Sequence, residues 1–320
     1  MTELLLTGLD GKNPLAFLAA LGVLNALADR TKDGTPEPRL VWRAGGTYQP
    51  AIMGGPDRGA LLDVLVQDLA SFRGEPAIEW LHYRKDGDGA EAHDLKPPPG
   101  FFVDYLSRLL GDCPSRGVSD ELRRSLAFAA AFATDVAVDN NGNTKPTALH
   151  FTAGQQEFLT MVSELIQGVR VEDLEEALFG PWRYERPLPV LQWDNTSARD
   201  YALRASDPSK DKKLGVPGAD WLAFRGLPFI RVAPVGDRIV TTGCSGEWKT
   251  GTFRWPIWTV PLSRPVIGSV LTSSEVFEVD PGVLRARGIA IVFESAIRRS
   301  DQGGYGSFAP ARMARPARAG

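Results

Sequence analysis

The chain contains 320 residues, of which 43% are hydrophobic and 23% are charged, a composition typical of a soluble globular protein with room for two domains. Because no run of about eighteen apolar residues occurs, we expect neither a membrane span nor a signal peptide. The two cysteines, Cys113 and Cys244, lie far apart and exclude a disulfide framework or a Cys-x-x-Cys zinc site, so the simplest expectation is a cytoplasmic protein.

The charged residues are distributed unevenly along the chain. Residues 1–180 contain 16 Lys and Arg against 26 Asp and Glu, whereas residues 181–320 contain 20 against 13. The first part therefore carries a charge near −10 and the second a charge near +7. A cationic part attracts polyanions such as nucleic acid. The alternative is that the two parts neutralise each other within the fold.

The first part is expected to begin with a strand and a buried helix. Residues 3–7 are short and apolar, and Asn13 and Pro14 are typical of an N-cap and a first helical position. The helix that they start runs to Arg30 and is apolar on nearly all sides, so we expect it to be buried. The elements expected next are strands at residues 39–43 and 47–53, an amphipathic helix at 56–72 and a strand at 77–83.

The middle of the chain is predicted to be helical. A polar loop rich in Gly and Pro at residues 84–100 precedes it and is expected to be exposed. A small bundle is expected to follow, interrupted by an irregular segment. Its predicted helices lie at residues 101–112, 119–136, 154–169 and 171–180. A change toward tryptophan, proline and basic residues then places a domain boundary near residue 183.

The second part is predicted to be smaller, basic and β-rich. Its expected elements are a helix at residues 219–226, strands at 229–233, 238–243 and 252–255, a short helix after Pro261 and a strand at 288–298. The tail, residues 306–320, contains three arginines and no acidic residue, and we expect it to be flexible. The predicted fold class is therefore α+β, with an acidic domain of mixed strands and helices at residues 1–183 and a basic domain at 184–320.

Motifs for catalysis are absent from the sequence. His82, His93 and His150 pair with no Cys, Asp or Glu at metal-ligand spacing, and neither a Gly-x-Ser-x-Gly elbow nor a Walker loop occurs. We therefore expect no catalytic residue, no metal and no cofactor. The best carboxylate pair, Asp194 and Asp200, could bind Mg²⁺ and make the chain a metal-dependent nucleic-acid phosphodiesterase. The alternative, which we favour, is that Asp194 caps a short helix.

The segment DNNGNTKPTALHFTAGQQEFL, residues 139–159, is rich in amide side chains. Its candidate nucleic-acid-binding residues are Asn140, Asn141, Asn143, Lys145, Gln155 and Gln156. Because amides donate and accept hydrogen bonds, they can contact base edges, sugars or phosphates, and the lysine adds a charge contact. The alternative is an Asn-Gly turn with the glutamines near the start of the next helix.

Basic residues supply the second group of candidates. In ARDYALRASDPSKDKK they are Arg199, Arg204, Lys210, Lys212 and Lys213, and in EWKTGTFRWPIW they are Lys249 and Arg254. A mobile basic loop can order on a phosphate backbone, although a run of charge is also typical of plain solvated surface. Strand alternation places Arg254 opposite Phe253 and Trp255, which we expect to be core residues more often than platforms for stacking bases.

The opening stretch LTGLDGKNPLAFLAALGVLNALADR resembles the start of large-subunit proteins of type I CRISPR surveillance (Cascade) complexes, especially the I-U branch, also called I-G. In those proteins a first strand is followed by a turn with Asn-Pro or Pro-Leu and a helix with an Ala-Leu-Gly run. The stretches TALHFTAGQQEFL, WDNTSARDYALRASDP, PGADWLAFRGLPFI and FRWPIW are similar to later parts of the family. The resemblance therefore extends to about residue 262.

The resemblance implies a non-catalytic subunit of a crRNA-guided effector complex. Such a subunit recognises the protospacer-adjacent motif, helps to open the duplex, supports the displaced strand and presents a docking surface for a helicase-nuclease. The expected partners are crRNA-bound backbone subunits, double-stranded DNA and displaced single-stranded DNA, with no membrane. Unlike the longer large subunits, this chain has its helices in the middle, which leaves room for a separate small subunit. A protein-only scaffold is the remaining alternative.

Overall fold

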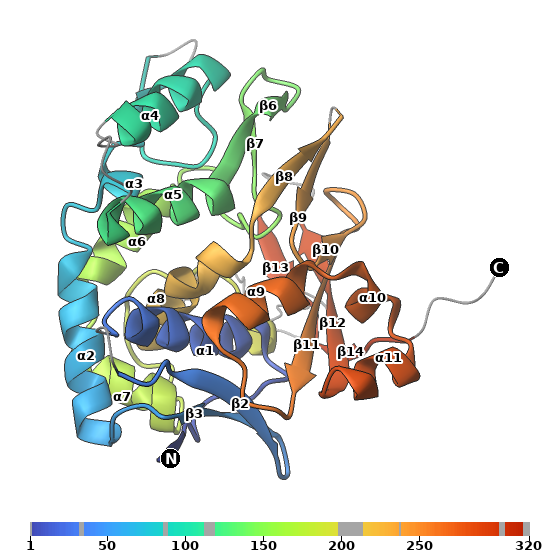
Figure 1. The fold of residues 1–320 in the computed structure, drawn as a ribbon. Coiled ribbons are helices and arrows are strands. Elements are labelled where there is room, and N and C mark those ends of the chain that lie inside the picture. Colours follow the sequence, from blue (N-terminus) through green and yellow to red (C-terminus); the bar gives the residue numbers. More distant parts are fainter. Residues whose placement is uncertain are drawn as a thin grey trace, which may run out of the picture.

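The computed structural model describes residues 2–31, 35–85, 89–111, 119–197, 214–236, 238–300 and 305–315. The protein has the predicted α+β class, with a pair of buried helices at its centre (Figure 1). Three-stranded and five-stranded antiparallel sheets lie beside this pair, and further helices surround it. Within the described ranges, no helix has the length and apolar character needed to cross a membrane.

The N-terminal sheet has three antiparallel strands in the order β1-β3-β2. They are β1 (Glu3–Leu5), β2 (Arg39–Ala44) and β3 (Tyr48–Met53). All three strands predicted in this region are thereby confirmed. The sheet packs on the central helix through aromatic contact, because the Trp42 ring on β2 stacks with Phe17 at 6.0 Å between centroids.

Helix α1 (Pro14–Ala28) is buried along almost its whole length, as its apolar sequence predicts. The Asn13 side chain caps it by accepting a hydrogen bond from Leu15 N at 2.9 Å. Pro14 occupies the first helical position, where its missing N–H costs no intrahelical bond. The predicted start and burial of this helix are confirmed.

Helix α8 (Pro217–Gly226) packs against α1 at backbone distance. A Cβ atom on Gly22 would lie 1.8 Å from the carbonyl oxygen of Leu222, and one on Gly226 would lie 2.2 Å from the carbonyl oxygen of Leu18. Both positions therefore require glycine, since any side chain would push the helices apart. The crossing joins residues from the two sides of the predicted boundary near residue 183, which remains a prediction.

Helices from the first part surround this pair (Figure 1). Those near α8 are α2 (Arg58–Ser71), α6 (Phe158–Gly168) and α7 (Val171–Phe179). Helix α7 packs against both α2 and α8, and α6 packs against α8. The helices predicted for these segments are confirmed. Helices α6 and α7 pack on α8, whereas α2 packs on α1 and α7.

A second group of elements lies above the helix pair in Figure 1. Its helices are α3 (Pro76–Glu79), α4 (Pro99–Gly111) and α5 (Asp120–Phe132). Its hairpins are β4 (Tyr83–Arg84) with β5 (Glu91–Ala92), β6 (Ala133–Val138) with β7 (Thr144–Pro146), and β8 (Val232–Val235) with β9 (Arg238–Thr241). The 3-10 turn η3 (Leu227–Phe229) connects α8 to β8.

The C-terminal sheet is built on the long strand β12 (Ile289–Arg299), as predicted. Its other strands are β10 (Cys244–Ser245), β11 (Thr252–Trp258), β13 (Gly306–Phe308) and β14 (Arg312–Met313). Helices α9 (Arg264–Thr272), α10 (Ser274–Glu278) and α11 (Pro281–Ala286) connect β11 to β12. Phe253 and Trp255 on β11 are buried, which confirms that they belong to the core.

The strand predicted at residues 77–83 is wrong. Residues 76–79 form the short helix α3, because the Glu75 side chain caps its first turn and Pro76 sets the first helical position. Ala77 and Ile78 are buried by this helix, so their apolar character reports burial and not strand. Only Tyr83, at the end of the predicted range, lies in a strand.

The loop predicted at residues 84–100 was expected to be exposed, but part of it is buried. His93 and Leu95 are buried, and β4 pairs with β5 in this range. The helix predicted at 119–136 ends at Phe132, where the chain continues directly as β6. Tertiary pairing of β6 with β7 outweighs the helical propensity of these residues.

The tail at residues 306–320 was expected to be flexible, and its first half is instead part of the sheet. Strands β13 and β14 both pair with β12, and Phe308 is fully buried. The Gly306 N–H also donates to the carbonyl oxygen of Phe151, which connects the tail to the amide-rich segment. The final residues, 316–320, lie outside the described ranges.

Candidate nucleic-acid interface

The asparagine-rich stretch forms the turn of the β6–β7 hairpin. The Asp139 carboxylate accepts hydrogen bonds from the backbone N–H groups of Asn141 at 2.8 Å and Asn143 at 3.1 Å. Asn140 and Asn141 are exposed and Asn143 is half-buried. None of the three amide side chains bonds to another described residue. The predicted Asn-Gly turn is thus present, and its backbone is fixed while its amides remain available to a ligand. We call residues 139–143 the amide turn.

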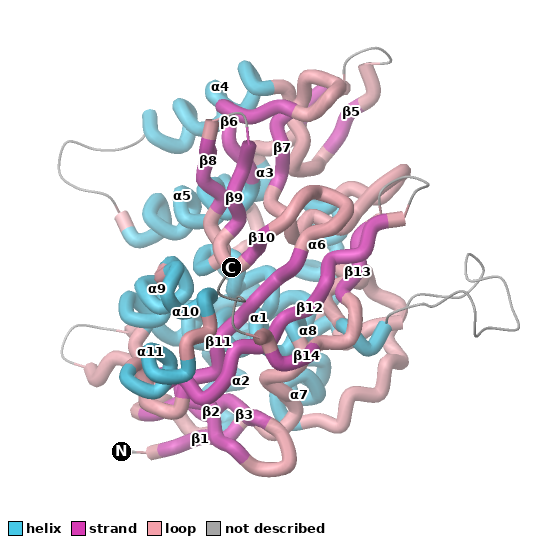
Figure 2. Tube along the Cα trace, turned by 90° about the vertical axis from the view of Figure 1, so that its right-hand side faces the viewer, coloured by secondary structure: helices cyan, strands magenta, loops and turns pink. Residues whose placement is uncertain are grey.

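The hairpin is attached to the segment before α4 directly next to its turn, where Thr144 pairs with Val138. The backbone N–H and the hydroxyl of Thr144 both donate to the carbonyl oxygen of Pro97, at 2.9 and 3.0 Å. Lys145 follows on β7 and is half-buried. This attachment places Lys96, the neighbour of Pro97, beside the hairpin. Figure 2 faces this side, with β6 and β7 above β10 and the C-terminal sheet.

Trp248 lies between β10 and β11 and is 43% exposed. The guanidinium carbon of Arg299 lies 3.4 Å from its ring centroid, and the Lys96 ammonium lies 5.8 Å away. Arg299 also donates to the carbonyl oxygens of Ala148 and His150, both at 2.9 Å. Arg299 therefore connects the middle of the amide-rich segment, at Ala148 and His150, to a half-exposed tryptophan. We call Lys96, Trp248, Lys249 and Arg299 the tryptophan surface.

The guanidinium group of Arg299 donates its hydrogen bonds to neutral groups. Its three hydrogen bonds go to the carbonyl oxygens of Ala148, His150 and Trp248, and no carboxylate of a described residue pairs with it. Burial lowers the pKa of the Arg299 guanidinium to about 10, which leaves it charged at neutral pH. Lys249 is exposed next to Trp248. The surface therefore keeps a positive field.

A buried pair fixes the polypeptide beneath this surface. The His150 ring lies 2.8 Å from the Asp94 carboxylate, which also accepts from the Phe158 N–H at 3.0 Å. Burial would raise the pKa of Asp94, but His150 and the backbone donors outweigh it and hold the value at about 2. Asp94 therefore stays ionised and joins both ends of the segment from His150 to Phe158.

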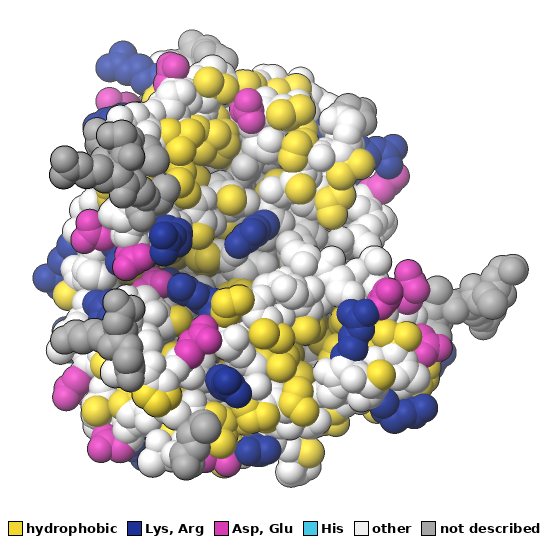
Figure 3. Space-filling view, viewed as in Figure 1, with side chains coloured by type: hydrophobic (Ala, Val, Ile, Leu, Met, Phe, Trp, Pro, Cys, Tyr) yellow, Lys and Arg dark blue, Asp and Glu magenta, His cyan; other side chains and the backbone are white. Residues whose placement is uncertain are grey.

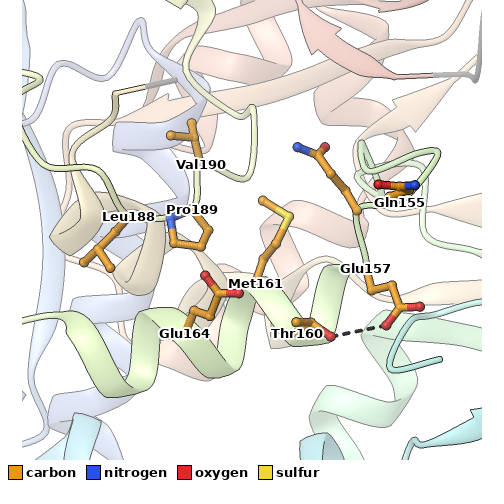
Figure 4. Close-up of a pocket in the computed structure, with 9 residues that line it drawn as sticks. Gln155, Glu157, Thr160, Met161, Glu164, Leu188, Pro189 and Val190 are labelled. Atoms are coloured by element: carbon orange, nitrogen blue, oxygen red, sulfur yellow. Dashed lines mark hydrogen bonds between the residues drawn. The ribbon is translucent and has the colours of Figure 1, made fainter. Parts of the chain in front are cut away.

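The two glutamines lie at a different place, in a cleft of about 280 Å³ (Figure 4). Gln155 is exposed, and the buried Gln156 Oε1 has no partner among the described residues. Glu157 and Glu164 also line this cleft. Two carboxylates repel a phosphate, so we do not place Gln155 or Gln156 on the same ligand path as the amide turn.

The remaining predicted cations divide into two groups. Arg254 donates to Glu294 at 2.9 Å and to the Phe277 carbonyl oxygen at 3.0 Å, so its charge is used inside the fold. The others, which lie outside the described residues, are Arg199, Arg204, Lys210, Lys212 and Lys213. Their predicted contact with the nucleic-acid backbone remains a prediction.

Part of the charge asymmetry is neutralised within the fold. Several carboxylates of the first part pair with arginines of the second: Glu176 with Arg183, Asp173 with Arg186, Asp29 and Asp68 with Arg225, and Asp29 also with Arg264. Internal neutralisation, the alternative to polyanion attraction, therefore accounts for some of the basic second part. Arg299 of the tryptophan surface is a cation to which this does not apply, because its hydrogen bonds go to carbonyl oxygens.

Asp194 has the capping role that we favoured. Its Oδ1 accepts from Asn13 Nδ2 and from the Thr196 N–H, both at 2.9 Å, and its Oδ2 accepts from the Tyr184 hydroxyl at 2.8 Å. The 3-10 turn η1 (Asn195–Ser197) follows directly. Among the described residues there is no group of three or more His, Cys, Asp or Glu that could hold a metal ion. Asp200 lies outside the described ranges.

Sequence reasoning missed Lys96 and Arg299 as members of a candidate interface. Arg299 follows a β-branched strand and Lys96 lies in a stretch of prolines, so neither position carries a local signal. Trp248 did carry a local signal, because it lies between Gly246 and Gly251, and a tryptophan in such a glycine-flanked turn is typically not a core residue.

Comparison of the chain with protein-family models, with curated proteins and with solved structures gave no match.

Proposed function

We propose that this protein is a non-catalytic subunit of a crRNA-guided type I CRISPR effector complex and binds target DNA. The observation that carries the binding proposal is the amide turn, exposed and fixed by Asp139, above the half-exposed Trp248 with its adjacent cations. The assignment to the CRISPR complex rests on the sequence resemblance. The partners in this proposal are crRNA-bound backbone subunits and a recruited helicase-nuclease.

The amide turn supplies the contact to duplex DNA. Free Asn140 and Asn141 side chains can donate to and accept from base edges in a groove, which is the chemistry needed to recognise a short motif. Because Asp139 already orders the backbone of the turn, binding loses little conformational entropy there. The short motif next to the protospacer is the DNA element assigned to this turn.

The tryptophan surface supplies the contact to unpaired DNA. One face of Trp248 is covered by Arg299, and the exposed part of the ring can stack with a base. Lys96 and Lys249 beside it attract the phosphates that flank such a base. The displaced strand of an opened duplex offers both groups at once.

The experiment reconstitutes the complex. The full chain is co-expressed with crRNA-bound backbone subunits, purified through a tag on this chain and tested for bound RNA and for target-DNA affinity. We expect RNA and backbone subunits to co-purify, and Trp248→Ala to cost about 1–3 kcal/mol of DNA binding free energy without loss of assembly. If neither RNA nor backbone subunits co-purify, the subunit assignment is wrong.

Trp80 offers a matched control, because Arg108 lies over its ring at 4.1 Å in another part of the molecule. Trp80→Ala removes a similar cation–π pair and should leave DNA affinity unchanged. Thermal unfolding of both variants verifies that each is folded. Equal DNA affinity of the Trp248 and Trp80 variants would contradict the interface.

A further inference from the structure

A cleft of about 630 Å³ opens between α5 and α9, and Trp248 is not among the residues that line it. The end of α1, Arg225 of α8 and the turn η3 also contribute to its lining. Figure 3 shows Lys and Arg side chains gathered on this face over α5, α8 and α9, around a hollow. The cleft is lined by Arg123, Arg124, Arg225, Arg231 and Arg264. We call it the arginine cleft.

Three of these arginines are fixed by carboxylates. Arg124 donates to Glu75 at 2.7 Å, and Arg225 donates to Asp68 at 2.9 Å. Arg264 pairs with Asp29, which Arg225 also contacts. These bonds hold the guanidinium groups in place and neutralise much of their charge, so they form a rigid polar wall.

The other two arginines, Arg231 and Arg123, are exposed. Arg231 is exposed, and its side chain makes no hydrogen bond or ion pair with any described residue, while its carbonyl oxygen fixes the backbone by accepting from Thr242 N at 2.9 Å. Arg123 pairs with Asp120, but their side chains are 65% and 87% exposed. Such a surface pair is weak and gives way to a stronger acceptor. A phosphate accepts the same bidentate hydrogen bonds from a guanidinium as a carboxylate does, and it carries more negative charge.

The volume and the apolar lining of the cleft indicate what the ligand contains besides a phosphate. A volume of about 630 Å³ exceeds what a lone phosphate needs and lies within the usual range of small-molecule sites. Pro228, Phe229 and Pro265 provide apolar lining next to Arg231, where a sugar or a base can lie. We propose that the arginine cleft binds a nucleotide, with its phosphate on Arg231 and Arg123.

This nucleotide can be free or can be the phosphorylated end of a nucleic-acid strand. Both sources present the same chemistry to Arg231. The site uses none of the residues of the amide turn or the tryptophan surface, so it does not depend on the proposed function. A nucleotide site goes beyond DNA capture because it gives the protein a second, compact ligand.

The experiment titrates the full chain with ADP, with inorganic phosphate and with short oligothymidylates that carry a 5′-phosphate or a 5′-hydroxyl, by isothermal calorimetry. We expect ADP to bind more tightly than phosphate and Arg231→Gln to weaken ADP binding about tenfold, through loss of a charge-assisted contact. Arg123→Gln should weaken it less, because that charge is shared with Asp120. A preference for the 5′-phosphorylated strand identifies a strand end as the source, and no preference identifies a free nucleotide.

Arg285→Gln is the matched control, because Arg285 is exposed on α11 away from the cleft and removes the same unit of charge. The inference is overturned if ADP does not bind, if phosphate binds as tightly as ADP, or if the Arg231 and Arg285 variants bind ADP equally. Trp248→Ala separates the two proposals: it should lower oligonucleotide affinity and leave ADP binding unchanged. Loss of the DNA interface alone therefore does not remove the nucleotide site.

Discussion

Arg225 and Arg299 are both arginines that lie largely inside the protein, and their partners differ in charge. Arg225 is fully buried between Asp68 and Asp29. Burial would lower the pKa of its guanidinium, but these carboxylates outweigh it and raise the pKa. Arg299 instead bonds to carbonyl oxygens and to the Trp248 ring, and burial lowers its pKa to about 10. The first arginine has its charge neutralised locally, whereas the second keeps an unneutralised charge near the surface.

The difference between Arg225 and Arg299 shows which arginines of a basic sequence can attract a polyanion. An arginine between carboxylates contributes to stability and specificity of packing, and its field is cancelled within a few ångströms. An arginine held by carbonyl dipoles projects a net charge, and a neighbouring aromatic ring gives a ligand a surface on which to stack. Net charge per segment cannot separate the two cases, because it counts both arginines equally.

The largest effect is expected from removing the internal arginine of this comparison, Arg225. Arg225→Met should lower the free energy of unfolding by about 3–5 kcal/mol, because Asp68 is left buried without its main cation. Urea denaturation followed by tryptophan fluorescence measures it. Arg285→Gln, on the exposed α11, is the control and should change stability by less than about 0.5 kcal/mol. A cost below about 1 kcal/mol for Arg225→Met would show that the network is not a buried structural element.

Asp220 is an acidic residue that, like Arg299, lies largely inside the protein without an oppositely charged partner among the described residues. It is fully buried, its Oδ1 accepts from the Leu191 N–H at 2.9 Å, and its Oδ2 has no partner among the described residues. Burial, opposed by that hydrogen bond and assisted by the nearby Asp194, raises the pKa of this carboxyl from 3.8 to about 8. The folded protein therefore keeps a proton that the unfolded chain releases at lower pH.

The sign of the pH dependence follows from this raised pKa. The contribution of Asp220 to stability is fully present below about pH 4 and is lost as the pH rises toward 8. Asp220→Asn carries no such proton, so its stability relative to the native protein should increase by about 2 kcal/mol between pH 5.5 and 7.5. Thermal unfolding of both proteins over this range measures the difference. A difference that is constant with pH would mean that Asp220 is ionised in the fold.

The parts of the fold that local chemistry dictates were predictable from the sequence. Asn13 and Pro14 define the start of α1, and its uniform apolar character defines its burial. The prediction of a strand at residues 77–83 was wrong because Glu75 caps a short helix there, and strand propensity takes no account of such a cap. The prediction of a flexible tail was wrong because β13 and β14 form by pairing with β12, and the composition of the tail itself does not reveal that pairing.

The candidate site was predictable in one half only. The amide turn is a local feature, and Asn140 and Asn141 are exposed where the Asn-Gly sequence places a turn. The tryptophan surface joins Lys96, Trp248 and Arg299 from three distant segments, so no window of sequence contains it. Arg254 was a reasonable candidate by type, and only the position of Glu294 on the neighbouring strand shows that its charge is internal.

The smallest effects are expected from Arg254, which pairs with Glu294, and from Lys249, which is exposed beside Trp248. Arg254→Gln should cost about 1 kcal/mol of stability, because Glu294 retains Arg312 as a partner, and should leave DNA affinity unchanged. Lys249→Gln, at an exposed position beside Trp248, should leave stability unchanged. It should also reduce the slope of log affinity against log salt by about 1, because one phosphate contact is lost.

The two variants remove the same unit of charge from positions five residues apart, so a difference between them reports where each charge is used. Fluorescence anisotropy with single-stranded DNA over a salt series gives the slopes, and urea denaturation gives the stabilities. Equal slopes for the two variants would mean that DNA responds to net charge alone. In that case the location of Arg299 near the surface would give it no particular role in DNA binding. The difference between internal and surface arginines would then affect the stability of the fold only.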